Sequence, residues 1–121
     1  MTAPDNCPVP GAVYWVDLDP VVGSEQGGRR PVVVISPTTI NSKLPVVVVA
    51  TITSQSRFAS EIVPTLAAGE PLPKKSYVLT FQIRTLSITR LQQYVGSLTP
   101  DQMSEVKRGL AIVFGLLHPR G

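Results

Sequence analysis

Two runs of β-branched residues, at positions 32–36 and 46–52, constrain the fold of this chain more than any other feature. Valine, isoleucine and threonine have few χ1 choices and favour strands over helices. The first run is apolar almost throughout, which predicts a strand buried on both faces. Five further segments rich in Val, Ile, Tyr or Thr are predicted to be strands: residues 12–18, 61–66, 76–81, 84–91 and 94–98.

One helix is predicted near the C-terminal end of the sequence. Thr99 is suited to cap it, Pro100 fits its first turn, and Gln102 stands three residues after Thr99, as in a capping box. Apolar residues then recur along one face, which indicates packing against a core: Met103, Val106, Leu110, Val113 and Leu117. The His-Pro pair at residues 118–119 is expected to end this helix.

These elements predict a mainly β domain of the α+β class. Short strands with modest loops favour a curled antiparallel sheet or partial barrel of about six to seven strands, covered on one side by the C-terminal helix. A length of 121 residues fits a single domain. We expect residues 1–10, which contain three prolines, to be a flexible lead-in, and residues 11–118 to form the domain.

Charge and cysteine content narrow the function classes. Eleven basic and eight acidic residues give a net charge of +3, a mild bias toward anionic partners that is too weak for strong nonspecific DNA binding. The lone Cys7 cannot form an internal disulfide and fits a reducing compartment. No leader-like segment and no apolar run of membrane length is visible, so we expect a cytoplasmic protein without a membrane anchor.

A polar, glycine-rich loop at residues 23–31 runs directly into the first β-branched run. Pro31 restricts Arg30 to extended geometry at the point where a mobile loop meets a rigid strand. The planar fork of a guanidinium held there suits a phosphate group. A solvated hairpin loop fits the same residues, and Thr53, at the end of the second run, fits equally well a strand residue with no further role.

Several kinds of active site are excluded by the residue inventory. One histidine, one cysteine and scattered carboxylates match no metal-site spacing, and the glycine pattern matches neither a Walker loop nor a dinucleotide fingerprint. His118 stands three residues from the end of the sequence, where catalytic positioning is poor. Proton-transfer candidates are therefore Arg30, Glu25 and the hydroxyls of residues 51–54.

Four strings of residues closely resemble the MazF/PemK-type toxins, sequence-specific endoribonucleases of bacterial toxin–antitoxin pairs. They are Gly-Ala-Val-Tyr-Trp-Val-Asp-Leu-Asp-Pro at 11–20, the loop and strand at 23–36, Ala-Thr-Ile-Thr-Ser-Gln at 50–55, and Gln-Ile-Arg-Thr-Leu at 82–86. The resemblance implies an SH3-like curled barrel with a C-terminal helix, assembled as a homodimer.

The resemblance also implies a site. Its catalytic pair corresponds to Arg30 and Thr53, and no cofactor or metal is implied. The RNA-binding positions that match the family's strings are Glu25, Gln26, Ser54, Gln55, Gln82 and Arg84. Two departures bear on the choice of cleavage site: Phe81 stands where the family often has an acidic residue, and the turn at residues 69–75 is long and carries a basic pair.

The chemistry implied is metal-independent cleavage of single-stranded RNA by its own 2′-hydroxyl, leaving a 2′,3′-cyclic phosphate and a 5′-hydroxyl. The resemblance further implies a cognate antitoxin as partner, with DNA contacted only through that antitoxin. Arg57, Lys74 and Lys75 fit either a role in steering the RNA backbone or a solvated surface. Two other functions stay open: a gyrase-poisoning toxin of the same fold that acts by binding protein, and a noncatalytic SH3-like RNA-binding module.

Overall fold

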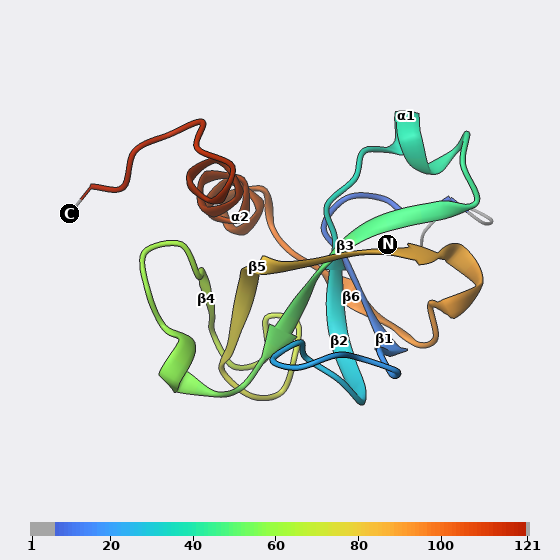
Figure 1. Cartoon of the computed structure of the whole chain (residues 1–121), viewed down its shortest axis with the longest axis horizontal. Helices are drawn as coiled ribbons and strands as arrows, with labels where there is room; N and C mark the ends of the chain where they lie inside the picture. The colour runs from blue at the N-terminus through green and yellow to red at the C-terminus, as the bar shows by residue number, and fades with distance from the viewer. Residues whose placement is uncertain (1–6, 121) are drawn as a thin grey trace.

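Six strands form one curled antiparallel sheet in the computed structural model, which describes residues 7–120 (Figure 1). The strands are β1 (Ala12–Asp17), β2 (Arg29–Val34), β3 (Val46–Thr53), β4 (Thr65–Leu66), β5 (Ser76–Ser87) and β6 (Tyr94–Ser97). The helices are α1 (Thr38–Asn41) and α2 (Pro100–Val113), and 3₁₀ turns occupy Ser56–Phe58 and Ile88–Arg90. The sheet order is β4-β5-β3-β2-β1-β6, which confirms the predicted fold class.

Apolar side chains alternate between the two faces of the sheet and build a core on each. Along β2, Val33 belongs to one core, whereas Val32 and Val34 belong to the other. The first core includes Met103 and Val106 of α2, so the helix covers that face. Because every second residue of a strand points to the same face, a run that is apolar throughout serves both cores at once. The prediction that this run is buried on both faces is confirmed.

The loop between β4 and β5 bridges toward the opposite edge of the sheet. Leu72, in this loop, is buried in the core that α2 covers. Pro71 packs against Gly96 of β6 so closely that a Cβ built on Gly96 would stand 2.8 Å from the Pro71 Cβ. Since β4 and β6 are the two edge strands, this contact brings the ends of the sheet order together and completes the curl.

The C-terminal helix begins as predicted and ends earlier than predicted. Thr99 and Gln102 form the capping box. The helix ends at Val113, where Gly115 adopts a φ of 74° and its N–H donates to the Ile112 carbonyl, while the Leu116 N–H donates to Ala111. This pair of bonds is a Schellman motif, which favours glycine because it needs a left-handed residue. The prediction that the helix reaches His118 was therefore wrong.

Strand boundaries differ from the sequence-based expectation in several places. Residues 61–64 do not form the predicted strand, because the Ile62 carbonyl accepts a 2.5 Å hydrogen bond from the Thr80 hydroxyl and only a bridge from Ser60 to Val63 is made. The two strands predicted at 76–81 and 84–91 are joined in one strand, β5, which continues past a register shift opposite Ala50 and Thr51 of β3. This strand ends at Ser87, and residues 88–90, which were predicted to be strand, form a 3₁₀ turn instead. None of the helices within residues 7–120 is long and apolar enough to cross a membrane.

Part of the expected lead-in lies within the described residues. Pro8 is buried, and its carbonyl accepts a 2.8 Å hydrogen bond from the side chain of Asn41. Val9 packs against the second core. Residues 1–6 lie outside the described part of the chain, and the boundary at residue 11 stays a prediction.

Gly109 sets the distance between α2 and the segment before β4. A Cβ at this position would stand 2.4 Å from the Ile62 carbonyl oxygen and 3.0 Å from the Thr80 methyl group. We expect Gly109→Ala to destabilise the fold by about 1–3 kcal/mol, since the overpacking exceeds the roughly 1 kcal/mol that alanine gains in helix propensity.

Urea unfolding followed by circular dichroism measures the Gly109→Ala effect. The exposed Ser104 of the same helix gives the control, because Ser104→Ala changes propensity without a clash and should shift stability by no more than about 0.5 kcal/mol. A midpoint for Gly109→Ala at or above that of the parent would contradict the close approach.

Candidate active site

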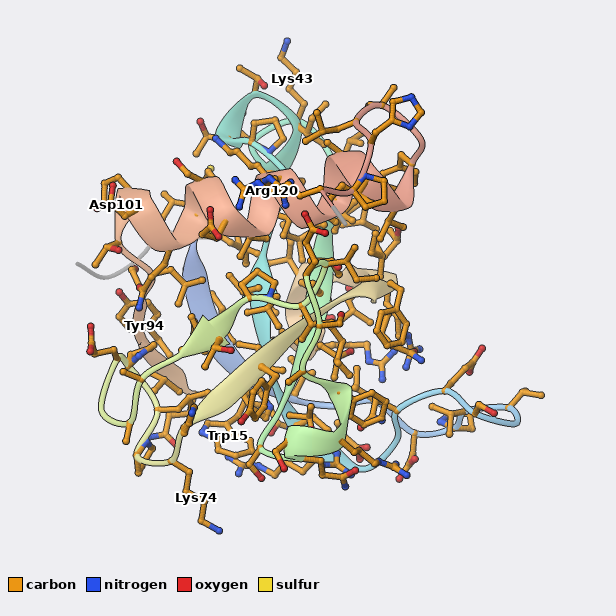
Figure 2. The ribbon with its side chains drawn as sticks, turned by 90° about the vertical axis from the view of Figure 1, so that its left-hand side faces the viewer. Trp15, Lys43, Lys74, Tyr94, Asp101 and Arg120 are labelled. Atoms are coloured by element: carbon orange, nitrogen blue, oxygen red, sulfur yellow. The ribbon has the colours of Figure 1, made fainter. Side chains whose placement is uncertain are left out.

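A pocket of about 300 Å³ opens at the end of the sheet where β1 and β3 end and β2 and β5 begin. Figure 2 shows Trp15 and Lys74 together at this end of the molecule, away from α2. The walls of the pocket come from four separate stretches of the chain. The lining residues are Trp15, Arg29, Arg30, Pro31, Ile52, Thr53, Ser54, Leu72, Pro73, Lys74 and Ser76.

The register of the sheet explains why Arg30 and Thr53 share this pocket. Val32 pairs with Thr51 and Val33 with Ala50, so the same register continued by two residues puts Arg30 opposite Thr53. Directly opposed residues in antiparallel strands lie on one face with Cβ atoms about 5 Å apart. The ladder stops next to Pro31, which has no N–H to contribute, and the pocket opens where the pairing ends.

Among the residues that the structure describes, one hydrogen bond holds the guanidinium of Arg30. Its Nε donates a 3.1 Å hydrogen bond to the Gly27 carbonyl, and the side chain is half-buried. The one ion pair within residues 7–120 joins Arg108 and Glu61, so no carboxylate there neutralises Arg30. The two terminal nitrogens therefore stay available for an anion, in the fork geometry that binds phosphate oxygens.

The hydroxyl of Thr53 is fixed at the end of β3. The side chain is only 2% exposed, and its Oγ1 accepts a 3.2 Å hydrogen bond from the backbone N–H of Gln55. Because a hydroxyl has one proton and two lone pairs, accepting this bond leaves the proton free to donate. A phosphate oxygen in the pocket is a suitable acceptor for it.

The pocket is electropositive. Arg29, Arg30 and Lys74 line it, and no aspartate or glutamate is among the described lining residues. Arg29 is tied down, with its guanidinium carbon 4.6 Å from the centre of the Trp15 ring and its Nε donating to the Gln92 side chain at 3.3 Å. Clustered cations in a partly enclosed site create a local field far stronger than a net charge of +3 suggests.

The loop at residues 18–28, which precedes β2, is ordered by hydrogen bonds between its two ends. The Leu18 N–H donates to the Gly28 carbonyl at 2.9 Å, and the Gly28 N–H donates to the Asp19 carboxylate at 2.9 Å. Gly27 has no room for a side chain, since a Cβ would stand 2.8 Å from that carboxylate. The loop thus presents the Gly27 carbonyl that orients Arg30, which ties the glycines of the motif to the geometry of the site.

The structure brings three of the predicted site residues into the pocket: Arg30, Thr53 and Ser54. The others surround it without being among its described lining residues. Glu25 accepts a 2.9 Å hydrogen bond from the Val22 N–H in the loop, and the side chain of Gln55 accepts one from Arg57. Their assignment to RNA binding stays a prediction.

Three further predicted residues lie along the loop and β5. The side-chain oxygen of Gln26 is buried and accepts no hydrogen bond from the described residues. The Gln82 carbonyl accepts a 3.4 Å hydrogen bond from the Thr51 hydroxyl, and Arg84 donates to the Leu18 carbonyl at 2.6 Å. Arg84 therefore holds the start of the 18–28 loop, whereas a role for Gln82 and Arg84 in contacting RNA stays a prediction.

Sequence reasoning missed Trp15 and Ser76 as pocket residues. Trp15 pairs with Pro31 across β1 and β2, so the strand register, had it been assigned, would have placed it beside the arginines. Ser76 is buried and donates a 2.8 Å hydrogen bond to the Lys74 carbonyl. No local pattern distinguishes it from other strand serines.

Comparison with known proteins identifies the class to which this fold and pocket belong. A model of the PemK-like, MazF-like toxins of type II toxin–antitoxin systems matches residues 10–114. The match spans most of the chain, and this protein therefore belongs to that family.

Individual relatives agree with this membership. Endoribonuclease MazF of Staphylococcus saprophyticus is 44% identical over 110 residues, covering 88% of this chain and 90% of the relative. A crystal structure of MazF from Deinococcus radiodurans is similar with a TM-score of 0.79 and 28% identity, covering 90% and 97% of the two chains. A mycobacterial endoribonuclease in complex with its cognate antitoxin is similar with a TM-score of 0.78 and 28% identity, covering 93% of this chain and 99% of the other. The chain is thus a homologue of MazF endoribonucleases.

Proposed function

We propose that this chain is a toxin that cleaves single-stranded RNA, with Arg30 and Thr53 acting on the phosphodiester that is cut. One observation carries the proposal: two residues 23 positions apart, an arginine and a threonine, line the same electropositive pocket. The 44% identity to an endoribonuclease supports the same activity.

The reaction is an internal transesterification. The ribose 2′-oxygen attacks the phosphorus and loses its proton, the bond from phosphorus to the 5′-oxygen breaks, and that oxygen takes up a proton. Arg30 stabilises the extra negative charge on the phosphate in the transition state, and Thr53 donates a hydrogen bond to one of its oxygens. The products are a 2′,3′-cyclic phosphate and a 5′-hydroxyl, and DNA is excluded because it lacks the nucleophile.

The assay that tests the proposal combines the purified protein, a long single-stranded RNA and EDTA. We expect cleavage at a few short motifs with the stated ends, and no cleavage of single-stranded DNA of the same sequence. Intact RNA, with Arg30→Ala indistinguishable from the parent, would favour the gyrase-poisoning or RNA-binding alternatives.

Glu25 is a candidate proton acceptor on chemical grounds. Its carboxylate accepts a hydrogen bond from the Val22 N–H, in the same loop whose Gly27 carbonyl binds Arg30. Loss of a general base costs about 10²- to 10⁴-fold in rate. We expect Glu25→Gln to lower kcat in that range with little change in KM, as measured by single-turnover cleavage, and Ser24→Ala beside it to cleave normally. An unchanged kcat for Glu25→Gln would remove Glu25 from the reaction.

Solved complexes of similar proteins with an antitoxin support a proposal about partners. We propose that the chain forms a homodimer, that a cognate antitoxin blocks its RNA site, and that it acts in the cytoplasm, contacting DNA only through that antitoxin. Exposed apolar side chains at the end of α2 and just beyond it, Val113, Phe114, Leu116 and Leu117, are a candidate association surface. Light scattering tests the dimer: a mass of about 26 kDa, twice 13.0 kDa, supports it, and the single-chain mass contradicts it.

A further inference from the structure

We propose that Lys74 binds a second RNA phosphate, next to the one that is cut, and that it contributes to RNA affinity rather than to the chemical step. The inference rests on the proposed RNA-cleaving function. It gives Lys74 a role that it does not give to the other two basic residues considered for steering RNA, Arg57 and Lys75. It assigns a role to the long, basic turn between β4 and β5, which the catalytic pair leaves unused.

The turn holds Lys74 in a fixed place on its own wall of the pocket. Leu72, two residues earlier, is buried in the core. Ser76, two residues later, is buried and donates to the Lys74 carbonyl at 2.8 Å. Pro71 is wedged against Gly96 of β6. The backbone at Lys74 is therefore anchored on both sides, which limits the backbone entropy lost when its side chain binds.

The ammonium group of Lys74 is available for an anion. Its side chain extends into solvent at the pocket end of the molecule (Figure 2) and forms no hydrogen bond or ion pair with the described residues. Arg29 differs, because Trp15 and Gln92 already engage its guanidinium. Arg57 is likewise engaged, by the Phe58 ring and the Gln55 side chain, and it does not line the pocket among the described residues.

Geometry distinguishes the two phosphates. Arg30 and Thr53 come from the paired ends of β2 and β3, whereas Lys74 comes from the β4–β5 turn. A single-stranded RNA carries a phosphate at every nucleotide, so a strand whose scissile phosphate sits at Arg30 brings a neighbouring phosphate toward another wall. Lysine suits this second contact because it binds phosphate as a point charge with little geometric demand.

The test measures binding of an RNA oligonucleotide that contains one cleavage motif and a single 2′-deoxyribose at the cut site, which blocks cleavage. A phosphate contact adds about 0.7 to the salt slope of single-strand binding, so Lys74→Ala should weaken binding about 5-fold at 100 mM salt and about 2-fold at 300 mM. Lys74→Arg should restore both affinity and slope. The neighbouring Lys75 is exposed and outside the described pocket lining, and Lys75→Ala should leave the slope unchanged.

A methylphosphonate, which removes the charge of one linkage, locates the contact. At one linkage next to the scissile one, the substitution should abolish the penalty of Lys74→Ala, because the two changes remove the same interaction. A penalty that persists at every linkage, or that vanishes only at the scissile linkage, overturns the inference. Cleavage of the unmodified RNA by the parent protein is measured in parallel, so that failure of the proposed function is recognised separately.

Discussion

Replacing Arg30 by alanine is expected to lower kcat/KM for RNA cleavage by about 10²- to 10³-fold, the usual cost of removing a preorganised donor from a developing negative charge. The effect should be large because no other described arginine on the pocket wall is free to replace it. Arg29 is stacked on Trp15 and bonded to Gln92. Single-turnover cleavage of a short RNA measures the loss.

Two variants isolate the role of the guanidinium. Arg30→Lys keeps the charge and loses the planar fork, so it should recover only part of the activity. Lys43→Ala removes one positive charge at the opposite end of the molecule (Figure 2) and should cleave like the parent. Equal losses for Arg30→Ala and Lys43→Ala would mean that overall charge, and not a site, is responsible.

Replacing Thr53 by valine, which has nearly the same shape, is expected to lower kcat by about 10²-fold, since one hydrogen-bond donor to the phosphate is lost. The fold should tolerate the change, because the Gln55 N–H that loses its acceptor belongs to an exposed residue that water reaches. Thr53→Ser keeps the hydroxyl and should retain most of the activity. The measurement is again single-turnover cleavage, with unfolding curves to compare stability.

Thr51 provides the matched control for this prediction. It stands two residues earlier on β3, is equally buried, and its hydroxyl donates to the Gln82 carbonyl instead of lining the described pocket. Thr51→Val should therefore cleave within a few-fold of the parent. If Thr51→Val lost as much cleavage activity as Thr53→Val, the effect would come from the packing of buried threonines in β3 and not from a phosphate contact by Thr53.

The strands and the helix start could be predicted because their signals are local. The β-branched run at 32–36 lies in β2 as far as Val34, the run at 46–52 lies in β3, and the capping box at Thr99 is formed. Residues 29–31 were expected to be loop and belong to β2 instead, because Asp17 pairs with Arg29 across the hairpin. Pairing partners lie far apart in the sequence, so propensity alone could not extend the strand.

The proposed catalytic pair was reached through family resemblance. The pocket around the pair could not be predicted from the sequence. Trp15, Ser76 and the wall at Leu72–Pro73 meet Arg30 only through strand register and through the turn that packs on β6. The α2 end shows the limit of periodicity: Leu117 continues the helical spacing, yet Gly115 ends the helix first. Gly115 favours a helix end at that point, whereas the apolar spacing as far as Leu117 favours a longer helix, and the prediction followed the spacing.

The central claim is that Arg30 and Thr53 act on the same phosphate in one transition state. A double-mutant cycle on the single-turnover kcat/KM of Arg30→Ala, Thr53→Val and the combined variant tests it most directly. When two residues act as a unit, the double variant loses far less kcat/KM than the product of the losses in the two single variants. We expect that result here. Losses that multiply fully in the double variant would show that the two side chains work independently, and would contradict the account.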